Sequence, residues 1–362
     1  MRLHIFNPEH DIALASGLSN FTAPHAGRQL RHDLGFLPAV WAKVGDVVMV
    51  DDVDQARNAW QKLRHRAHTL LGDDILVGAN PEFAPAKFPF YPGQQYSIEP
   101  WGWNSALRAQ LMRCGLGTEQ LPTDEQLQTI RLLSHRRTAG SLLPKLRVEG
   151  TVGETFECRT EEQVGQLLSQ YGHLVLKAPW SSSGRGLRFL SSKQNLTNSE
   201  HIAGWFHNVV DSQGAVMVEP YYNKVKDFGM EFYSDGEGGI DYLGLSLFHT
   251  TNGAYTGNIL ATEKVKREII SHYIPIALIE NIQGKICQES DRLFKGKYRG
   301  PFGIDMMLVN GDQCLLHPCV EINLRRTMGH VALSLSPADD ELRCVMRIEN
   351  TEKNYKLTIN RL

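Results

Sequence analysis

The sequence predicts an α/β protein that begins with a parallel α/β unit and continues into regions with antiparallel strands. Three apolar runs separated by helical stretches favour a parallel sheet near the start of the chain. These runs cover residues 3–6, 45–52 and 74–80. Four later runs are typical of antiparallel strands, at residues 230–234, 240–248, 302–309 and 314–324. The length of 362 residues suits two or three packed units.

Composition excludes several classes of protein. The chain is 42% hydrophobic and 22% charged, and its 38 basic and 40 acidic residues give a net charge of −2. No basic domain or tail stands out, so we expect no nucleic-acid partner. No apolar run approaches the roughly 18 residues of a membrane span, and the start lacks a signal-peptide pattern. Six scattered cysteines without a Cys-x-x-Cys pair suggest free thiols, and we expect a cytoplasmic protein.

The first strand, residues 3–6, leads into a predicted helix. Asn7 suits the N-cap and Pro8 the first helical position. His10 and Asp11 then lie near the end of a strand, where side chains can face a substrate crevice. An acid in the first turn of a helix is the simpler explanation for Asp11.

Residues 81–104 interrupt the α/β pattern. They contain five prolines and seven aromatic residues, a proline density that no helix tolerates. We expect a long ordered loop that closes a first domain at residues 1–104. Its aromatic side chains either fix the loop onto the surface or form a wall of a substrate pocket.

Local signals place several helices and strands in the middle of the chain. Thr123 with Gln126, and Thr160 with Gln163, form capping boxes, and Gly172 is a stop signal. A short helix is predicted from Ser134. A further helix is expected at about 199–210, and the expected strands cover residues 173–177, 187–190 and 215–222.

The segment KAPWSSSGRGL, residues 177–187, follows a strand directly. Lys177 ends that strand, and the serines and glycines after it offer hydroxyl and backbone donors that suit a phosphate cover. It is not a Walker A loop, because there the lysine follows the glycines and opens a helix. A glycine-serine hairpin with a surface lysine would look the same.

A second segment, residues 216–232, combines an apolar strand with two acids. The strand runs into Glu219 and Pro220, and Asp227 lies eight residues beyond Glu219. Extended backbone leaving a buried strand can bind the edge of an adenine, and a nearby carboxylate can accept from ribose hydroxyls. A hairpin with one surface acid is the alternative.

The third segment, residues 300–330, is the most specific. Asn310-Gly311 is a strong hairpin signal that brings Asp305 toward Glu321 and Asn323. Two carboxylates and an amide oxygen suit Mg²⁺. Arg325 and Arg326 follow at once, and arginine suits phosphoryl or carboxylate oxygens. The alternative is a surface strand pair with mixed charges.

Strand register constrains this hypothesis. A two-residue turn at Asn310-Gly311 pairs residues whose numbers sum to 621, so Asp305 would face Leu316 and Glu321 would point to the opposite face. A shared site requires an odd shift, from a three-residue turn or from a bulge. Pro318 cannot donate to the ladder and is a natural place for a bulge.

Taken together, the three segments resemble the ATP-grasp superfamily in order and spacing. The resemblance covers about residues 105–335, and residues 1–104 resemble the domain that precedes ATP-grasp. It implies a two-lobed α+β region, with a first lobe at 105–222 that carries a phosphate flap and a second lobe at 223–362 that carries a magnesium site.

The resemblance also implies roles for individual residues. Lys177 would bind the nucleotide phosphates, Asp227 the ribose, and Arg325 the transferring phosphate. The flap would comprise Ser181, Ser182, Ser183, Gly184 and Gly186. The adenine site would comprise Glu219, Pro220, Tyr221 and Tyr222. The ligands of two Mg²⁺ ions would be Asp305, Glu321 and Asn323.

Two departures from the family pattern stand out, and one further residue is a candidate. An earlier lysine that usually reaches the nucleotide is replaced by Arg136 or Arg137. The glutamate-adding branch has an arginine two residues after its ribose aspartate, and here Gly229 occupies that position. Asn258, in the segment 250–258, would lie at the phosphate site, unless the segment is an exposed hairpin loop.

The implied activity is that of an ATP- and Mg²⁺-dependent carboxylate-amine ligase. It would activate a small-molecule carboxylate as an acyl phosphate for attack by an amine, with release of ADP and phosphate. The alternatives are a phosphotransferase with a hydroxyl acceptor and a non-catalytic nucleotide sensor. An intact set of Asp305, Glu321 and Asn323 argues against the sensor.

Overall fold

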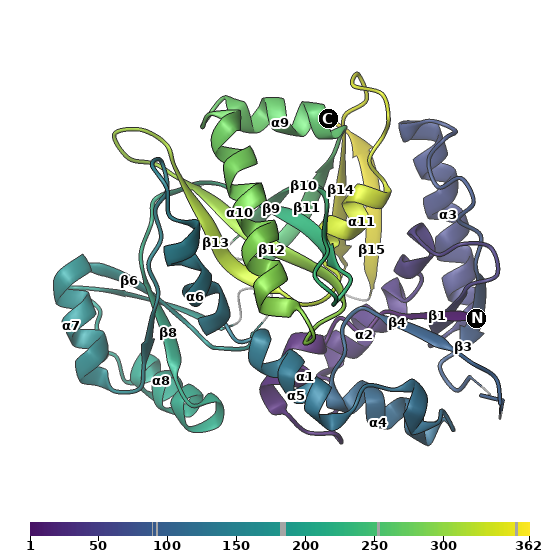
Figure 1. Ribbon diagram of the computed structural model, residues 1–362, viewed down its shortest axis with the longest axis horizontal. Coiled ribbons are helices and arrows are strands. Elements are labelled where there is room, and N and C mark those ends of the chain that lie inside the picture. The colour runs from purple at the N-terminus through teal and green to yellow at the C-terminus, as the bar shows by residue number, and fades with distance from the viewer. Residues whose placement is uncertain (89, 92, 182–185, 252–253, 352–353) are drawn as a thin grey trace.

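Three β-sheets organise the chain in the computed structural model, which describes residues 1–88, 90–91, 93–181, 186–251, 254–351 and 354–362 (Figure 1). A parallel sheet of four strands lies near the start of the chain. A small antiparallel sheet and a large antiparallel sheet of seven strands follow. The expected α/β class, with a parallel unit first and antiparallel sheets later, is confirmed.

The parallel sheet has the strand order β3-β2-β1-β4. Its strands are β1 (Arg2–Ile5), β2 (Val47–Val50), β3 (Glu82–Pro85) and β4 (Ser97–Pro100). The strand predicted at 74–80 is wrong, because this run forms turns in which Leu76 and Gly78 have positive φ. Instead β3 and β4 arise inside the proline-rich segment predicted to be a loop. Pro85 and Pro100 end the two edge strands, where a missing N–H is tolerated.

The helices of the first 135 residues cover both faces of this sheet. They are α1 (His10–Ser16), α2 (His25–Leu34), α3 (Val53–Leu71), α4 (Ser105–Arg113) and α5 (Asp124–Leu133), with short 3₁₀ turns at Leu37–Val40 and Thr118–Gln120. The helix predicted to start at Asn7 begins at His10. Asn7 does not cap it, because its amide is bound to the backbone N–H and C=O of Gly102.

The segment 81–104 packs closely. The rings of Phe88, Phe90 and Tyr96 meet edge to face, with centroids 5.2–6.0 Å apart. Trp101 is buried against Phe6. This agrees with the expectation that the aromatic residues fix the segment in place.

The parallel sheet shares a hydrophobic core with the last part of the chain. Phe6, Val48 and Trp60 lie in one cluster with Met346 and Ile359. The two strands that contribute from the far end of the chain are β14 (Cys344–Asn350) and β15 (Tyr355–Arg361). Figure 1 shows this hairpin in yellow beside α3. The first and last segments of the chain therefore form one packed unit.

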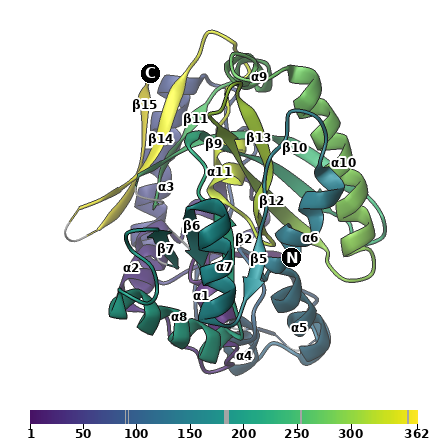
Figure 2. The ribbon, with the colours of Figure 1, turned by 90° about the vertical axis from the view of Figure 1, so that its left-hand side faces the viewer.

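The small sheet forms a separate lobe after α6 (Arg137–Leu146). Its elements are β5 (Phe156–Cys158), α7 (Glu161–Tyr171), β6 (His173–Lys177), β7 (Leu187–Ser191), α8 (Glu200–Gln213) and β8 (Val216–Pro220). The strand order is β5-β8-β6-β7, and the core lies entirely between residues 156 and 218. Figure 2 views this lobe with α7 and α8 toward the reader.

Most local predictions for this region are confirmed. Both capping boxes form, at Thr123 and Thr160, and Gly172 is the C-cap of α7. The helix predicted from Ser134 starts instead at Arg137, because Ser134 closes α5 as its C-cap.

The large sheet has the order β13-β12-β9-β10-β11-β14-β15. Its other strands are β9 (Lys224–Ser234), β10 (Ile240–Thr251), β11 (Ala254–Leu260), β12 (Gly300–Val309) and β13 (Leu315–Asn323). Three helices accompany it: α9 (Glu263–Ser271), α10 (Ile276–Phe294) and α11 (Met328–Ser334). One face is apolar and packs on α10, and the opposite face carries the polar side chains.

Two further observations bear on the class of protein. All six cysteines are free, as expected. Among the described helices, none combines the length and apolar character that crossing a bilayer requires.

Candidate active site

The pairing of β12 with β13 brings the predicted acidic residues together. Asp305 lies directly opposite Glu321, and Asn323 lies opposite Gly303, so all three side chains leave one face. The expected odd shift is present, because the strands are joined by five residues, 310–314, and pairs near the turn sum to 624. A further irregularity between Asp305 and Met307 raises the sum of the paired residue numbers by two. It leaves residues 318–320, including Pro318, as a bulge.

Asp305 lies at the centre of this cluster. The amide of Asn323 donates to its Oδ2 over 3.1 Å. Burial raises the pKa of Asp305 to about 7, and the neighbouring Glu321 carboxylate acts in the same direction. Two carboxylates held this close favour a divalent cation between them.

The donor set offers Mg²⁺ few protein ligands. In the part of the chain that the structure describes, no group of three or more histidine, cysteine, aspartate or glutamate residues could hold a metal. Asp305 and Glu321 would thus supply two ligands, and phosphate oxygens would complete the shell. The Oδ1 of Asn323 accepts from Arg325 over 2.9 Å, so Asn323 joins the set only after that bond is exchanged.

Arg325 forms a two-pronged ion pair with Asp11. Its Nε and Nη2 donate to the Asp11 carboxylate over 2.7–3.1 Å. Burial alone would lower the pKa of Arg325, but the carboxylates of Asp11, Glu321 and Asp305 together outweigh it and raise that pKa. Burial would likewise raise the pKa of Asp11, and Arg325 lowers it. Asp11 is therefore more than an acid in a helical first turn, because it holds the guanidinium predicted to meet the transferring phosphate.

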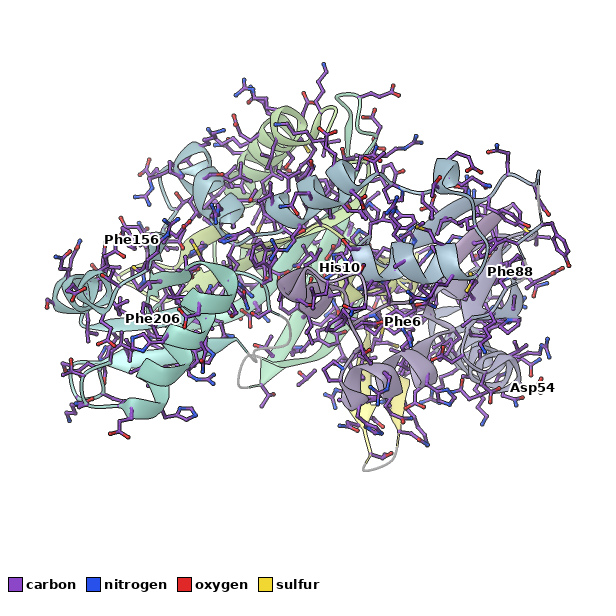
Figure 3. All side chains as sticks on the ribbon, turned by 90° about the horizontal axis from the view of Figure 1, so that it is seen from below. Phe6, His10, Asp54, Phe88, Phe156 and Phe206 are labelled. Carbon is purple, nitrogen blue, oxygen red and sulfur yellow. The ribbon has the colours of Figure 1, made fainter. Side chains whose placement is uncertain are left out.

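His10, beside Asp11 on α1, is buried and lies 3.2 Å from the amide of Asn104. Burial lowers the pKa of His10 to about 4, so the ring is neutral at pH 7. Figure 3 shows His10 near the middle of the molecule, between the lobe that carries Phe156 and Phe206 and the unit that carries Phe6 and Phe88.

Lys177 and Glu219 form a buried ion pair in the small lobe. Lys177 Nζ lies 2.6 Å from Glu219 Oε2, and each residue is only 6% exposed. Glu219, predicted for the adenine site, thus contacts the predicted phosphate lysine. Beyond it, Tyr221 is exposed and Tyr222 packs edge-on against His317.

Arg136 joins the small lobe to the acidic cluster. Its Nε donates to the carbonyl of Ala178 over 3.0 Å, its Nη2 to Ser181 Oγ over 3.3 Å, and its Nη1 lies 2.9 Å from Glu321 Oε2. Arg137 points instead to Glu157, 3.5 Å away. Of the two candidates, only Arg136 lies in the site.

The predicted flap is described at its two ends. Ala178 N–H donates to Gly186 O over 2.9 Å, and a Cβ at Gly186 would lie 2.4 Å from Ser181 Oγ. Glycine is therefore required at position 186 for this close approach to Ser181. Ser182, Ser183 and Gly184 lie outside the described residues.

Two further candidates have partners of their own. Asp227 accepts from Lys224 Nζ and Thr250 Oγ1. Asn258 is fully buried and bonds to Ser246 Oγ over 2.8 Å. Asn258 thus belongs to the polar face of the large sheet and not to an exposed loop.

Sequence reasoning missed a buried acid next to this cluster. Glu231 lies opposite Gly303 and accepts from Thr327 Oγ1 over 2.8 Å, and His330 Nδ1 is 3.1 Å away. Burial raises the pKa of Glu231 to about 8. The signal was available, because period-two alternation from Asp227 places Glu231 on the same face of β9.

His317 was also missed. It is fully buried, it lies opposite Met307, and neither ring nitrogen has a partner among the described residues. Burial lowers its pKa to about 4. The strand period predicted its face, but nothing in the sequence indicated its burial.

Neither models of known protein families nor curated protein sequences match the chain. Solved structures do. The biotin carboxylase domain of the Hydrogenobacter thermophilus 2-oxoglutarate carboxylase, a complex with MgADP, ADP and bicarbonate, aligns with a TM-score of 0.54. The two share 13% identity over 88% of this chain and 72% of that one.

Two other solved structures align with lower scores, both at 13% identity. N5-carboxyaminoimidazole synthetase of Staphylococcus aureus, complexed with ADP, has a TM-score of 0.48 over 97% of this chain and 83% of its own. A putative ATP-grasp superfamily protein of Archaeoglobus fulgidus has a TM-score of 0.45 over 100% of this chain and 99% of its own. The biotin carboxylase alignment, together with the motif order, shows that this chain has the ATP-grasp fold.

Proposed function

We propose that the chain is an ATP- and Mg²⁺-dependent ligase that activates a carboxylate as an acyl phosphate for attack by an amine. One observation carries the proposal: Asp305, Glu321, Arg325 and Arg136 converge from three parts of the chain on one face of the large sheet. Such a set holds a cation and supplies fixed positive charge where a phosphoryl group transfers.

The nucleotide is assigned to the junction of the small lobe and the large sheet, where Arg136 contacts both. Lys177 and Arg136 bind its phosphates, and Lys177 exchanges Glu219 for them. Tyr222 and His317 lie at the base end. Asp305 and Glu321 would hold Mg²⁺, which would offset the negative charge of the transferring phosphoryl group.

Arg325 is assigned to the acyl phosphate. Its pair with Asp11 fixes the plane of the guanidinium, and its bond to Asn323 sets its distance from the cation ligands. Charge that develops on the phosphoryl oxygens then meets a donor that needs no reorganisation. The loop between Ser181 and Gly186 would exclude water from the acyl phosphate.

ADP release tests the proposal. The protein is incubated with Mg·ATP, a panel of small carboxylic acids and hydroxylamine, which captures acyl phosphates as hydroxamates. The expected result is acid-dependent ADP together with a hydroxamate, and none of either for Asp305→Asn. ADP with a phosphorylated alcohol and no hydroxamate would replace the ligase by a phosphotransferase. Nucleotide binding without release of ADP in the presence of any acceptor would indicate a sensor.

A further inference from the structure

A cavity of about 170 Å³ lies at the carboxyl ends of the parallel strands, outside the site described above. Its lining includes residues that directly follow three of the strands: Phe6 and Asn7 after β1, Asp51 after β2, and Ala86 after β3. Residues of α4 also line it. Phe6, one of its lining residues, is labelled in Figure 3. The space far exceeds the roughly 10–15 Å³ that one water molecule needs. This edge of an open parallel sheet is where such sheets bind ligands.

The charges around the cavity favour an anion. Three arginines face two carboxylates, which leaves one positive charge in excess. Arg31 is already paired, with Glu9 Oε1 at 2.8 Å and Asp51 at 3.5 Å. Arg28 and Arg113 are exposed and have no carboxylate within 4.0 Å in the described chain. Two guanidinium groups that line one cavity without a counter-ion suit a carboxylate or a phosphate.

Glu9, which also lines the cavity, favours a hydrogen-bond donor or a cation. The side chain of Glu9 is 10% exposed, and its Oε2 is buried without a hydrogen-bond partner among the described residues. A buried acceptor without a donor is unfavourable, so a ligand that donates to it gains free energy. Phe21, Leu107 and Leu111 give the cavity an apolar part of its lining.

We propose that this cavity binds an amino-acid-like molecule, with its carboxylate or phosphate on Arg28 and Arg113 and its ammonium group on Glu9. Glu9 precedes α1, and Asp11 in the first turn of that helix holds Arg325. The cavity and the acidic cluster therefore share α1. The assignment of the molecule as one of the two substrates rests on the proposed function, whereas the binding itself does not.

Calorimetric titration of the nucleotide-free protein tests the proposal with four probes: L-glutamate, O-phospho-L-serine, glutarate and inorganic phosphate. We expect L-glutamate to bind at least about tenfold more tightly than glutarate, which lacks only the amine, or O-phospho-L-serine to bind at least about tenfold more tightly than inorganic phosphate, which lacks both the amine and the carboxylate. The amino acid that binds more tightly identifies a carboxylate or a phosphate as the anion. Binding of neither amino acid at millimolar concentration would overturn the proposal.

Three variants locate the binding. Arg28→Ala and Arg113→Ala should each weaken it by roughly 10- to 100-fold, and Glu9→Gln should remove the preference for the amine. Arg57→Ala is the matched control, because Arg57 is an exposed arginine of α3 that does not line the cavity. Unchanged melting temperatures verify folding. Affinities that none of the three variants alters would place the ligand elsewhere and refute the site.

The two proposals fail separately. Amino-acid binding without any response to Mg·ATP would refute the ligase and leave the cavity assignment standing. Acid-dependent ADP release with no binding of the four probes would refute the cavity assignment alone.

Discussion

At the scale of single residues, Arg325 is the side chain whose role the structure changes most. A guanidinium expected to be free for phosphate is paired with Asp11 and also donates to Asn323. Its pairing makes Arg325 a fixed donor, and it makes Asp11 a positioning residue of the same centre.

The pair predicts the behaviour of three variants. Arg325→Ala should leave ATP affinity nearly intact and lower turnover by on the order of 10²–10³, as for a lost electrostatic stabiliser. Arg325→Lys should recover part of that loss, because a point charge replaces a two-pronged donor. Asp11→Asn should lower turnover with little change in ATP affinity. ATP affinity and ADP release are measured for each variant. A wild-type rate of ADP release by Arg325→Ala would show that Arg325 has no catalytic role.

Stability gives a second measurement on Arg325. Removing one partner of a fully buried ion pair costs about 3–5 kcal/mol, because the other charge remains buried, and we expect a smaller cost here because each side chain is 16% exposed. Arg325→Ala should therefore be less stable than the double variant Arg325→Ala with Asp11→Asn in urea denaturation. Equal stabilities would mean that the pair is too well hydrated to fix the guanidinium.

Asp305 predicts a pH dependence. Its pKa is raised to about 7, so between about pH 4 and 7 the folded state retains a proton that the unfolded state loses. Ionisation of Asp305 thus lowers stability as the pH rises through that window. Without Mg²⁺, the melting temperature of Asp305→Asn relative to wild type should rise from pH 4 to 7 and then level off. Asp124→Asn, at an exposed acid, is the control, and a pH-independent difference for Asp305→Asn would contradict the assignment.

At the scale of elements, α11 depends on one hydroxyl. Thr327 Oγ1 accepts from the backbone N–H groups of Gly329 and His330 and donates to Glu231. Thr327→Val should cost roughly 2–3 kcal/mol, because it removes an N-cap and takes the hydroxyl donor away from a buried acid. Thr327→Ser is the matched control and should stay close to wild type. Chemical denaturation measures the difference, and equal stabilities would show that α11 needs no cap.

Local rules predicted the elements whose cause is local. The capping boxes at Thr123 and Thr160 formed as expected. The alternation of side chains along a strand required the odd shift in register that β12 and β13 display. The failures come from distant partners. Asn7 does not cap its helix, because its side chain bonds to Gly102. The strands β3 and β4 form because they lie at the edges of the sheet, where their prolines are tolerated.

The same distinction applies to the site. The faces of Asp305, Glu321 and Asn323 followed from strand period and order. The pair of Asp11 with Arg325 joins residues 314 positions apart, and no local pattern encodes such a contact. Which of Arg136 and Arg137 reaches the site also depended on where α6 begins.

At the scale of the whole molecule, nucleotide binding should be visible as stability. Mg·ATP at 100 times its Kd should add about 2.7 kcal/mol to the free energy of unfolding. Lys177→Ala should shift the required concentration upward by one to two decades, because it removes a charged phosphate contact. Thermal melts with ATP, with Mg²⁺ and with both test this. No shift with millimolar Mg·ATP would argue strongly against the nucleotide site.

The arrangement of cores predicts how the molecule opens. The small lobe has a core of its own between residues 156 and 218, whereas the parallel sheet shares its core with β14 and β15. Native-state hydrogen exchange should show the small lobe opening at a lower free energy than the shared core, and β1, β2 and β15 opening together. A single opening energy for all three sheets would contradict this.

The shared core also has a consequence for biosynthesis. Tyr355 N–H donates to Asp33 over 2.8 Å, and Arg66 Nε donates to the carbonyl of Ile359 over 3.0 Å, so residues translated late complete a unit translated early. While the ribosome makes the intervening segments, the nascent first hundred residues expose an apolar face whose cover does not yet exist. The small lobe, with its own core, can fold during that interval. Chaperones would therefore meet the beginning of this polypeptide for longer than its middle.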